Sequence, residues 1–388
     1  MSENNNQEVL LRVENLCQYF GPTKAVDDVS FTIRKGEVFG LVGESGCGKT
    51  TTGRSIIKIY DITSGSIYFK GQRTCAGTKS YYDKIKELKK SGKPGANKEI
   101  AKLQREIRLA RRDHKNGDAM YAATRVKEVR EKYAKLMKNC DPQKRNELRR
   151  EFDNELRIAK KTKLSTQIQM IFQDPIASLN PRMTVREIIA EGLIINGVRD
   201  KKYIDQKVFE ILEEVGLVRE HAGRYPHEFS GGQRQRIGIA RAVIMHPELL
   251  IADEPISALD VSIQAQVINL LNDLRKTLDL TILFIAHDLS VVKYFSDRIG
   301  VMYFGKMVEL ADAEELFAHP IHPYTRSLLS AIPLPDPVSE KNRKRITYDA
   351  KTAHDYSTDK PTLRELIPGH FVYCNDAEQA AYMEEFGL

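Results

Sequence analysis

The sequence lacks the features that mark membrane-spanning, exported and cysteine-rich metal proteins. Its apolar runs stay well short of the roughly 18 residues that a membrane-spanning helix needs, so any membrane contact would go through a partner. The polar start, residues 1–6, does not resemble a signal peptide. The five cysteines are scattered, without a C-x-x-C pair or a Cys/His cluster, which argues against a zinc or iron–sulfur site. One of them, Cys47, lies in a glycine-rich loop, which suits a reducing compartment.

Positive charge is concentrated in one segment of an otherwise ordinary composition of 41% hydrophobic and 29% charged residues. The net charge is +7, but residues 73–163 hold 28 lysines and arginines against 13 acids, or +15, which leaves −8 for the rest. Apolar residues of this basic arm (residues 73–163) recur every three or four positions, as in packed helices. We expect breaks at 91–95, at Asn116-Gly117-Asp118 and at Asp141-Pro142, hence an inserted helical hairpin or small bundle.

A glycine-rich loop near the N-terminus has the pattern G-x-x-x-x-G-K-[ST], and reads Gly43-Glu44-Ser45-Gly46-Cys47-Gly48-Lys49-Thr50-Thr51. An apolar run, 38–42, precedes it and a helix-like segment, Thr51–Tyr60, follows, which is the context that a phosphate-binding P-loop requires. The glycines let backbone N–H groups point at phosphate oxygens, and the helix start adds a positive dipole. Lys49 would reach the outer phosphates, and Thr50 would offer its hydroxyl to Mg²⁺.

The order of strand-like and helix-like segments predicts an α/β fold. Before the loop, residues 9–20 and 25–34 alternate apolar and polar and predict antiparallel strands, and 65–71 predicts another short strand. After residue 167, helices and short apolar strands alternate, which predicts a parallel sheet. These expected segments are helices at 184–197, 202–216 and 261–277, and strands at 248–252 and 280–285. From about residue 319 the tail is rich in proline and is predicted to be irregular.

Two acids follow one of the apolar strands. The run Leu249–Ala252 ends in Asp253 and Glu254. In a chain that also has a P-loop, the first of these acids, Asp253, would hold Mg²⁺, usually through water. The second carboxylate, Glu254, could then orient and polarise an attacking water.

A third segment reads Phe-Ser-Gly-Gly-Gln-Arg-Gln-Arg over residues 229–236 and runs into a helix-like stretch. A serine hydroxyl and glycine N–H groups at a helix start can bind a phosphate, as the P-loop does. With this segment, which contains Ser230, Gly231, Gly232 and Gln233, the chain resembles the ATP-binding cassette (ABC) family and differs from other P-loop proteins. The resemblance implies ATP and Mg²⁺ as ligands, with these residues contacting the ATP of a second subunit in a head-to-tail dimer.

Other landmarks of the family follow in the expected order over residues 9–71 and 164–315. Gln173 resembles the Q-loop glutamine that senses Mg²⁺ and water, and Asp260 ends a segment, 257–260, that resembles the D-loop. His287, which follows a strand, resembles the switch histidine at the γ-phosphate; a lone histidine there would otherwise be structural. Phe20, or Tyr19 beside it, could stack on adenine, or could be an edge-strand aromatic that fills a core.

Several segments are similar to one branch of the family, the peptide and nickel importers. Residues 172–183 are similar to the Q-loop region of oligopeptide and dipeptide importer ATPases, and the tail carries His322-Pro323-Tyr324-Thr325. A proline-rich linker is the alternative interpretation of that tail. The ending, 367–372, is similar to the second, F-type, ATPase subunit of such systems. Related ATPases often have a cysteine cluster in the tail; with Cys374 alone, we predict none here.

The resemblance implies an ATPase domain over 7–318, interrupted by the basic arm, and a C-terminal extension over 319–388. The implied protein is a peripheral ATPase at the cytoplasmic face of the membrane. It would power oligopeptide or dipeptide uptake together with a second ATPase subunit, two permease subunits and an extracytoplasmic substrate-binding protein. The sequence does not name the transported substrate.

The basic arm departs from the family, which needs only a short connection at this place. Three interpretations remain open: a solvated helical face without a partner, attraction to anionic lipids or acidic transporter regions, and nucleic-acid binding. Aromatic residues are sparse among the basic ones, which disfavours nucleic acid. The alternative function is therefore a soluble ABC ATPase that acts on nucleic acid or ribosomes through the arm.

Overall fold

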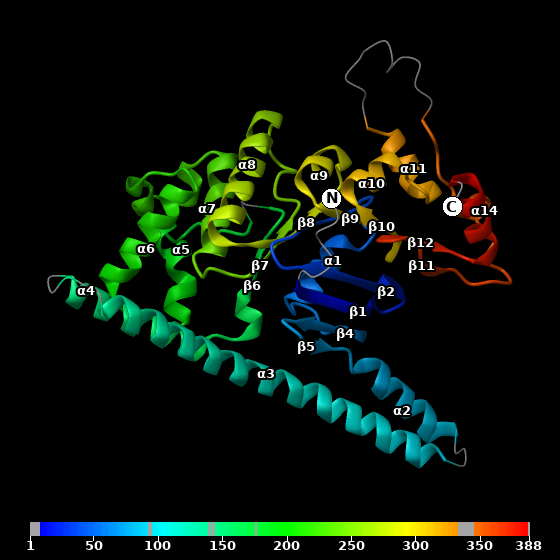
Figure 1. The fold of residues 1–388 in the computed structure, drawn as a ribbon, viewed down its shortest axis with the longest axis horizontal. Helices are drawn as coiled ribbons and strands as arrows, with labels where there is room; N and C mark the ends of the chain where they lie inside the picture. Colours follow the sequence, from blue (N-terminus) through cyan, green and yellow to red (C-terminus); the bar gives the residue numbers. More distant parts are fainter. Residues whose placement is uncertain are drawn as a thin grey trace, which may run out of the picture. The chain divides into compact units, whose positions relative to one another are not determined.

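The computed structural model describes residues 8–91, 95–138, 141, 144–174, 177–332 and 345–386 (Figure 1). The chain divides into two compact units. The first contains the residues up to Gly65 together with those from Ile282 onward, and the second contains Ser66–Thr281. Among the residues described, no helix combines the length and the apolar character needed to cross a bilayer.

The first unit contains an antiparallel hairpin and a mixed sheet. Its strands are β1 (Val9–Phe20), β2 (Thr23–Arg34), β3 (Val38–Val42), β8 (Thr281–Ala286), β9 (Arg298–Tyr303), β10 (Lys306–Asp312), β11 (Thr362–Ile367) and β12 (His370–Cys374). Its helices are α1 (Lys49–Ile56), α9 (Leu289–Phe295), α10 (Ala313–Ala318), α11 (Pro323–Ser330), α13 (Ala350–Ala353) and α14 (Asp376–Phe386). β1 and β2 pair antiparallel, as predicted, and the sheet runs in the order β11-β12-β10-β9-β3-β8.

The centre of this sheet is parallel, as the sequence predicts. β3 pairs in parallel with β8 on one side and with β9 on the other. Every residue of β3 and β8 is buried, which accounts for their continuous apolar sequences. The sheet therefore has a rigid core directly before the glycine-rich loop.

The second unit contains a hairpin, a parallel strand pair and most of the helices. Its strands are β4 (Ser64–Phe69), β5 (Gln72–Ala76), β6 (Ile168–Ile171) and β7 (Leu249–Asp253). Its α-helices are α2 (Lys79–Ser91), α3 (Ala96–Lys138), α4 (Arg145–Lys161), α5 (Val185–Ile195), α6 (Lys201–Glu214), α7 (Gly231–Val243) and α8 (Val261–Leu278). Short 3-10 turns lie at η1 (Leu164–Gln167), η2 (Arg219–Gly223) and η3 (Pro226–Glu228). β4 and β5 are antiparallel, and β6 and β7 are parallel.

The described part of the basic arm contains three helices, of which the long central helix α3 packs against the other two. α3 has 43 residues, or about 65 Å at 1.5 Å per residue. α2 packs on one end of it and α4 on the other (Figure 1), each through an apolar cluster. The predicted break at Asn116-Gly117-Asp118 is wrong, because α3 continues through it. Gly117 instead allows close packing: a Cβ there would lie 3.2 Å from Leu164 Cδ1. Residues 92–94 and Pro142 of the other expected breaks lie outside the described residues.

The C-terminal extension is more regular than predicted. Its described residues include α11, α14 and the strands β11 and β12, and β12 extends the sheet by pairing with β10. Pro323 occupies the first turn of α11, where a missing N–H has no cost and the fixed φ angle is favourable. Because Pro323 starts a helix, the prediction of an irregular tail from its proline content is wrong for this segment. Residues 333–344 of the tail lie outside the described residues.

Candidate functional site

The glycine-rich loop connects β3 to α1 in a conformation that only glycine tolerates at two places. Gly43 has φ +149° and Gly48 has φ +108°. A Cβ at Gly43 would lie 2.2 Å from the carbonyl oxygen of Met302, and one at Gly48 would lie 2.3 Å from that of Ala25. The loop is thus pressed against its own sheet, and α1 begins at Lys49, two residues earlier than expected, and ends at Ile56.

The side chains of the loop are arranged as a phosphate site requires. Lys49 is buried, and its Nζ donates hydrogen bonds to the carbonyl oxygens of Gly43 (2.7 Å) and Glu44 (2.9 Å). Its ammonium group therefore lies over the loop. Cys47 is also buried, and burial raises the pKa of its thiol, so the loop carries no thiolate that would repel phosphate.

The exposed part of the loop consists of Glu44, Ser45 and Gly46. Ser45 and Gly46 are exposed, and Thr50 and Thr51 are half-buried in the first turn of α1. A helix N-terminus, several backbone N–H groups, one ammonium and one hydroxyl suit phosphate oxygens together with a divalent cation. The chemistry of these donors therefore fits a nucleoside triphosphate and Mg²⁺.

A residue of the C-terminal extension contacts the loop directly, a role that no local sequence pattern predicts. The backbone N–H of Glu44 donates to the hydroxyl of Tyr324 at 3.0 Å. Tyr324 is only 2% exposed, and its ring lies 4.4 Å from that of Tyr303. The sequence marks Tyr324 as part of a family motif, but a contact between residues 280 positions apart has no local signature.

His322 and Pro323 hold Tyr324 in place. The Nδ1 atom of His322 accepts the backbone N–H of Tyr324 at 3.1 Å and so caps α11. Burial lowers the pKa of His322 to about 3, which keeps the ring neutral and Nδ1 available as an acceptor. The order His-Pro-Tyr is thus a helix start: the cap, a proline in the first turn, and an aromatic side chain that contacts the loop.

Glu309 on β10 anchors the same segment from the sheet. It is fully buried and accepts the backbone N–H groups of Ile321 (2.8 Å) and His322 (3.1 Å), and it pairs with Nε2 of His370 at 2.8 Å. A buried carboxylate needs this number of partners. Glu309 therefore fixes the start of α11 relative to β10 and β12.

We expect the change Tyr324→Phe to weaken ATP binding without unfolding the extension. It removes one acceptor for the Glu44 N–H and keeps the ring, and a hydrogen bond of this kind contributes about 1 kcal/mol, or roughly a fivefold change in dissociation constant. Fluorescence titration with an ATP analogue measures it. Tyr348→Phe, in the same aromatic group, is the matched control. Equal affinities for the two variants would show that the contact does not support the loop.

Two further predicted residues of the first unit lie where they could reach a nucleotide. Val42 at the end of β3 is in register with Ala286 at the end of β8, so the loop and the exposed His287 leave the sheet at the same edge. Phe20 is 45% exposed, and its ring contacts that of Tyr60 edge-on at 5.2 Å. An aromatic this exposed does not fill a core, which supports the stacking interpretation.

The second unit brings two other predicted residues into contact. Ile171 of β6 is in register with Ala252 of β7, so the segments after these strands leave at the same edge. There Nε2 of Gln173 donates to Oε2 of Glu254 at 2.9 Å. Asp253, the last residue of β7, is fully buried, whereas Glu254 has a left-handed backbone with φ 45°. Such a conformation is uncommon outside glycine and is concentrated at functional sites.

The Ser-Gly-Gly-Gln segment forms the start of α7. Ser230 is the N-cap: its Oγ accepts the N–H of Gln233 at 3.3 Å, and the Gln233 side chain accepts the N–H of Ser230 at 3.1 Å. Ser230 and Gly231 are exposed, Gly232 is half-buried, and Asp260 is exposed at the start of α8. This helix start is capped by its own side chains, and its exposed residues Ser230 and Gly231 lie at a helix N-terminus, where phosphate oxygens can bind.

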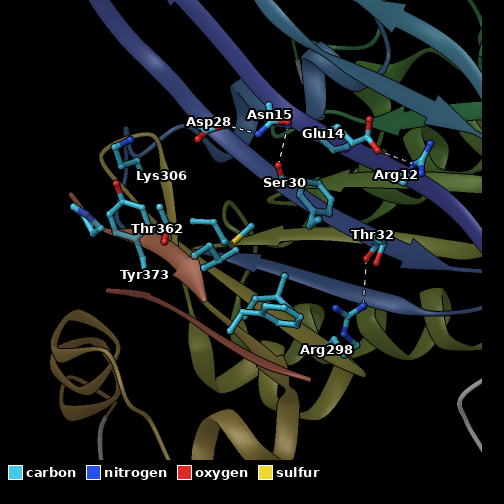
Figure 2. A pocket seen from close by; sticks show the side chains of 17 residues that line it. Arg12, Glu14, Asn15, Asp28, Ser30, Thr32, Arg298, Lys306, Thr362 and Tyr373 are labelled. Atoms are coloured by element: carbon cyan, nitrogen blue, oxygen red, sulfur yellow. Dashed lines mark hydrogen bonds and ion pairs between the residues drawn. The ribbon is translucent and has the colours of Figure 1, made fainter. Parts of the chain in front are cut away.

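A separate pocket of about 520 Å³ lies in the first unit, between the hairpin and the C-terminal strands, and its lining includes none of the predicted site residues. Figure 2 shows that several of its polar residues bind one another. Asn15 Nδ2 donates to Asp28 at 2.8 Å, and Arg298 donates to the carbonyl oxygen of Thr32 at 3.2 Å. Because protein partners already occupy these groups, we assign no ligand to it.

Comparisons with known proteins agree with this geometry. A family model described as "ABC transporter" matches residues 26–145 and 133–257, and one described as "Oligopeptide/dipeptide transporter, C-terminal region" matches 308–359. The chain is 49% identical over 380 residues to the oligopeptide transport ATP-binding protein OppF of Bacillus subtilis, covering 97% of this chain and 99% of that protein. It is 46% identical over 371 residues to the dipeptide transport ATP-binding protein DppF of Lactococcus lactis, covering 95% and 93%. Alignments of this extent include the basic arm, so the arm is shared with these relatives.

Solved structures show a similar fold. cbiO1 from Clostridium perfringens, part of the ABC transporter complex cbiONQ, has a TM-score of 0.53 at 22% identity and covers 81% of this chain and 92% of that one. The ATP-binding cassette MJ0796, solved as a dimer bound to ADP and Pi, has a TM-score of 0.51 at 20% identity and covers 78% and 99%. Likeness at these identities concerns the fold, and it confirms the predicted P-loop α/β architecture.

Proposed function

We propose that this chain, which belongs to the ABC transporter family, is the ATP-hydrolysing subunit of a peptide importer. The observation that carries the proposal is the 49% identity over nearly the whole chain to an oligopeptide transport ATP-binding protein. The match of residues 308–359 to the oligopeptide/dipeptide C-terminal region supports the same branch independently. The relatives with this arm are named as transport proteins, which supports transport over the nucleic-acid alternative.

In this proposal the chain's own residues bind and orient ATP. The backbone N–H groups of the P-loop and the ammonium of Lys49 hold its phosphates, and the ring of Phe20 stacks on its base. Mg²⁺, when bound, would neutralise phosphate charge, and Thr50, Asp253 and Gln173 are the residues that would hold it or its waters. Tyr324 keeps the loop in the binding conformation through the Glu44 N–H.

Glu254 is the proposed general base. Its carboxylate would accept a proton from the water that attacks the γ-phosphorus, as the bond from that phosphorus to the bridging oxygen of ADP breaks. Gln173 donates to the same carboxylate at 2.9 Å and so sets its orientation. His287 would contact the γ-phosphate, and its exposed place at the end of β8 leaves room for that contact.

The exposed N-terminus of α7 suggests how two ATPase subunits combine. Ser230, Gly231, Gly232, Gln233 and Asp260 would contact the nucleotide held by the P-loop of a second ATPase subunit. Closing and opening of that pair would drive two permease subunits, to which an extracytoplasmic binding protein delivers peptide. The proposed location is the cytoplasmic face of the membrane, with the permease as the anchor.

Affinity purification from native membranes tests the proposal. We expect the tagged chain, extracted in mild detergent, to copurify with a second ABC ATPase and two membrane permease subunits. An unrelated tagged cytosolic protein is the control for carry-over. Restoration of peptide uptake in a deletion strain completes the test. Copurification of RNA or DNA without membrane proteins would instead support the nucleic-acid alternative.

A further inference from the structure

One face of α3 carries a continuous series of exposed side chains, which we call the outer stripe. Its twelve positions run from Lys98 to Lys138 and follow one another at intervals of three or four residues. One of them is Asn116, and the side chains described at the other eleven are all exposed. Cations occupy seven places: Lys98, Lys102, Arg105, Arg112, Lys127, Arg130 and Lys138. The other four described places are Leu109, Met120, Ala123 and Ala134. The stripe therefore contains no acidic residue over about 60 Å of helix.

The opposite side of α3 is attached to the rest of the second unit. Ile100 and Ile107 are buried against α2, and Val129 and Tyr133 are buried against α4. In the middle, Tyr121 donates to Glu248 at 2.8 Å. Further bonds there join Arg73 to Asp113, and the N–H of Leu164 to the carboxylate of Asp118. The helix is thus packed against α2 and α4 near its ends and bonded to the rest of the second unit in its middle, so its other face is left to the outer stripe.

The positive charges of the stripe are only weakly neutralised by acidic side chains. Among the described side chains, one cation of the stripe forms an ion pair: Nζ of Lys127 lies 3.9 Å from Oε1 of Glu131, and both side chains are well exposed. Exposed pairs of this kind contribute little. Other faces carry closer pairs, such as Lys132–Glu155 at 3.1 Å and Lys84–Glu99 at 3.0 Å. The seven cations of the outer stripe therefore keep most of their positive charge available to an external anion.

The composition of the stripe fits a lipid surface better than a nucleic acid. It contains no aromatic side chain on which a base could stack. It does contain apolar residues between the cations, with Met120 62% exposed and Leu109 36% exposed. A row of cations along one helix face is attracted to the negative surface of an anionic membrane, and exposed apolar side chains between the cations can add contact with its interface.

We propose that the outer stripe of α3 binds the anionic lipid headgroups of the membrane in which the transporter works. The cations would pair with headgroup phosphates, while Leu109 and Met120 would enter the interface. The biological setting rests on the proposed function, but the lipid binding is a property of this chain alone. It would give the ATPase a membrane contact of its own, in addition to the permease.

Sedimentation of the purified chain with vesicles tests this inference. We expect binding to phosphatidylcholine vesicles that contain about one third phosphatidylglycerol, roughly a hundredfold weaker binding to phosphatidylcholine alone, and a steep loss with salt. The variant Lys102→Gln, Arg105→Gln, Lys127→Gln, Arg130→Gln should lose most of the binding. Glutamine is a good helix former, so the fold should persist, and circular dichroism checks it.

The matched control removes the same number of exposed cations from other elements of the second unit: Arg199→Gln, Lys201→Gln, Lys202→Gln, Lys276→Gln. It should bind anionic vesicles like the unchanged chain. Equal loss in both variants, or no binding by the unchanged chain, overturns the inference, as does RNA binding that anionic vesicles fail to displace. A chain that binds vesicles through the stripe but never copurifies with a permease would reject the proposed function and keep this inference.

Discussion

Replacing Glu254 with glutamine is expected to lower ATP turnover by about 10²–10⁴-fold and to leave ATP binding intact. A positioned general base contributes a factor of this size, and glutamine cannot accept the proton. Glutamine has nearly the same shape, and its amide oxygen can still accept the hydrogen bond from Gln173. Phosphate release measures turnover, and titration with a fluorescent ATP analogue measures binding.

The control for Glu254→Gln is Glu220→Gln, which removes an exposed carboxylate from the same unit. It should leave both measurements unchanged. Full turnover in the Glu254 variant would refute the role as base. A loss of ATP binding equal to the loss of turnover would show that Glu254 shapes the site rather than accepting a proton.

Replacing Glu309 with alanine is expected to lower the free energy of unfolding by about 3–5 kcal/mol, as for other broken buried charge networks. Glu309 is fully buried and accepts the N–H groups of Ile321 and His322 besides its contact with His370. Alanine would leave these buried donors without an acceptor, and each unsatisfied donor costs about 1–3 kcal/mol of stability. Urea unfolding measures the free energy, and amide exchange of α11 locates the loss.

Glu314→Ala is the matched control for Glu309, because Glu314 is an exposed acid only five positions away. Its effect should stay within about 0.5 kcal/mol. If the Glu309 variant unfolds like this control, the carboxylate does not anchor the extension. Because Tyr324 lies just beyond the anchored segment, the Glu309 variant should also bind ATP more weakly than the control.

The parts of the fold that could be predicted from the sequence are those with strong local signals. The fully buried strands β3, β7 and β8 have short apolar runs, and the P-loop has a fixed spacing of glycines. The start of α7 was recognisable because its capping serine and glutamine are the same residues that define the family motif. In these places local propensity, pattern and function agree.

The errors arose where tertiary packing overrides a local signal. Gly117 predicts a helix break, but the helix continues through it. Because Gly117 has no side chain, Leu164 can pack closely against α3 at this position. The prolines of the tail predict irregular chain, but Pro323 starts a helix whose cap is His322, a residue with a pKa lowered by burial. Contacts between distant residues, such as Gln173 with Glu254, follow from strand register and not from spacing.

The bond between Glu44 and Tyr324 bears on how such proteins can be shortened. A minimal cassette cut after β10 would keep every residue of the nucleotide-binding motifs and would still lose the acceptor for one amide of its catalytic loop. Rate constants from such a fragment would describe a looser enzyme than the natural one. In this chain the C-terminal extension therefore supports the P-loop directly, and a chimaera that receives this P-loop should receive the extension with it.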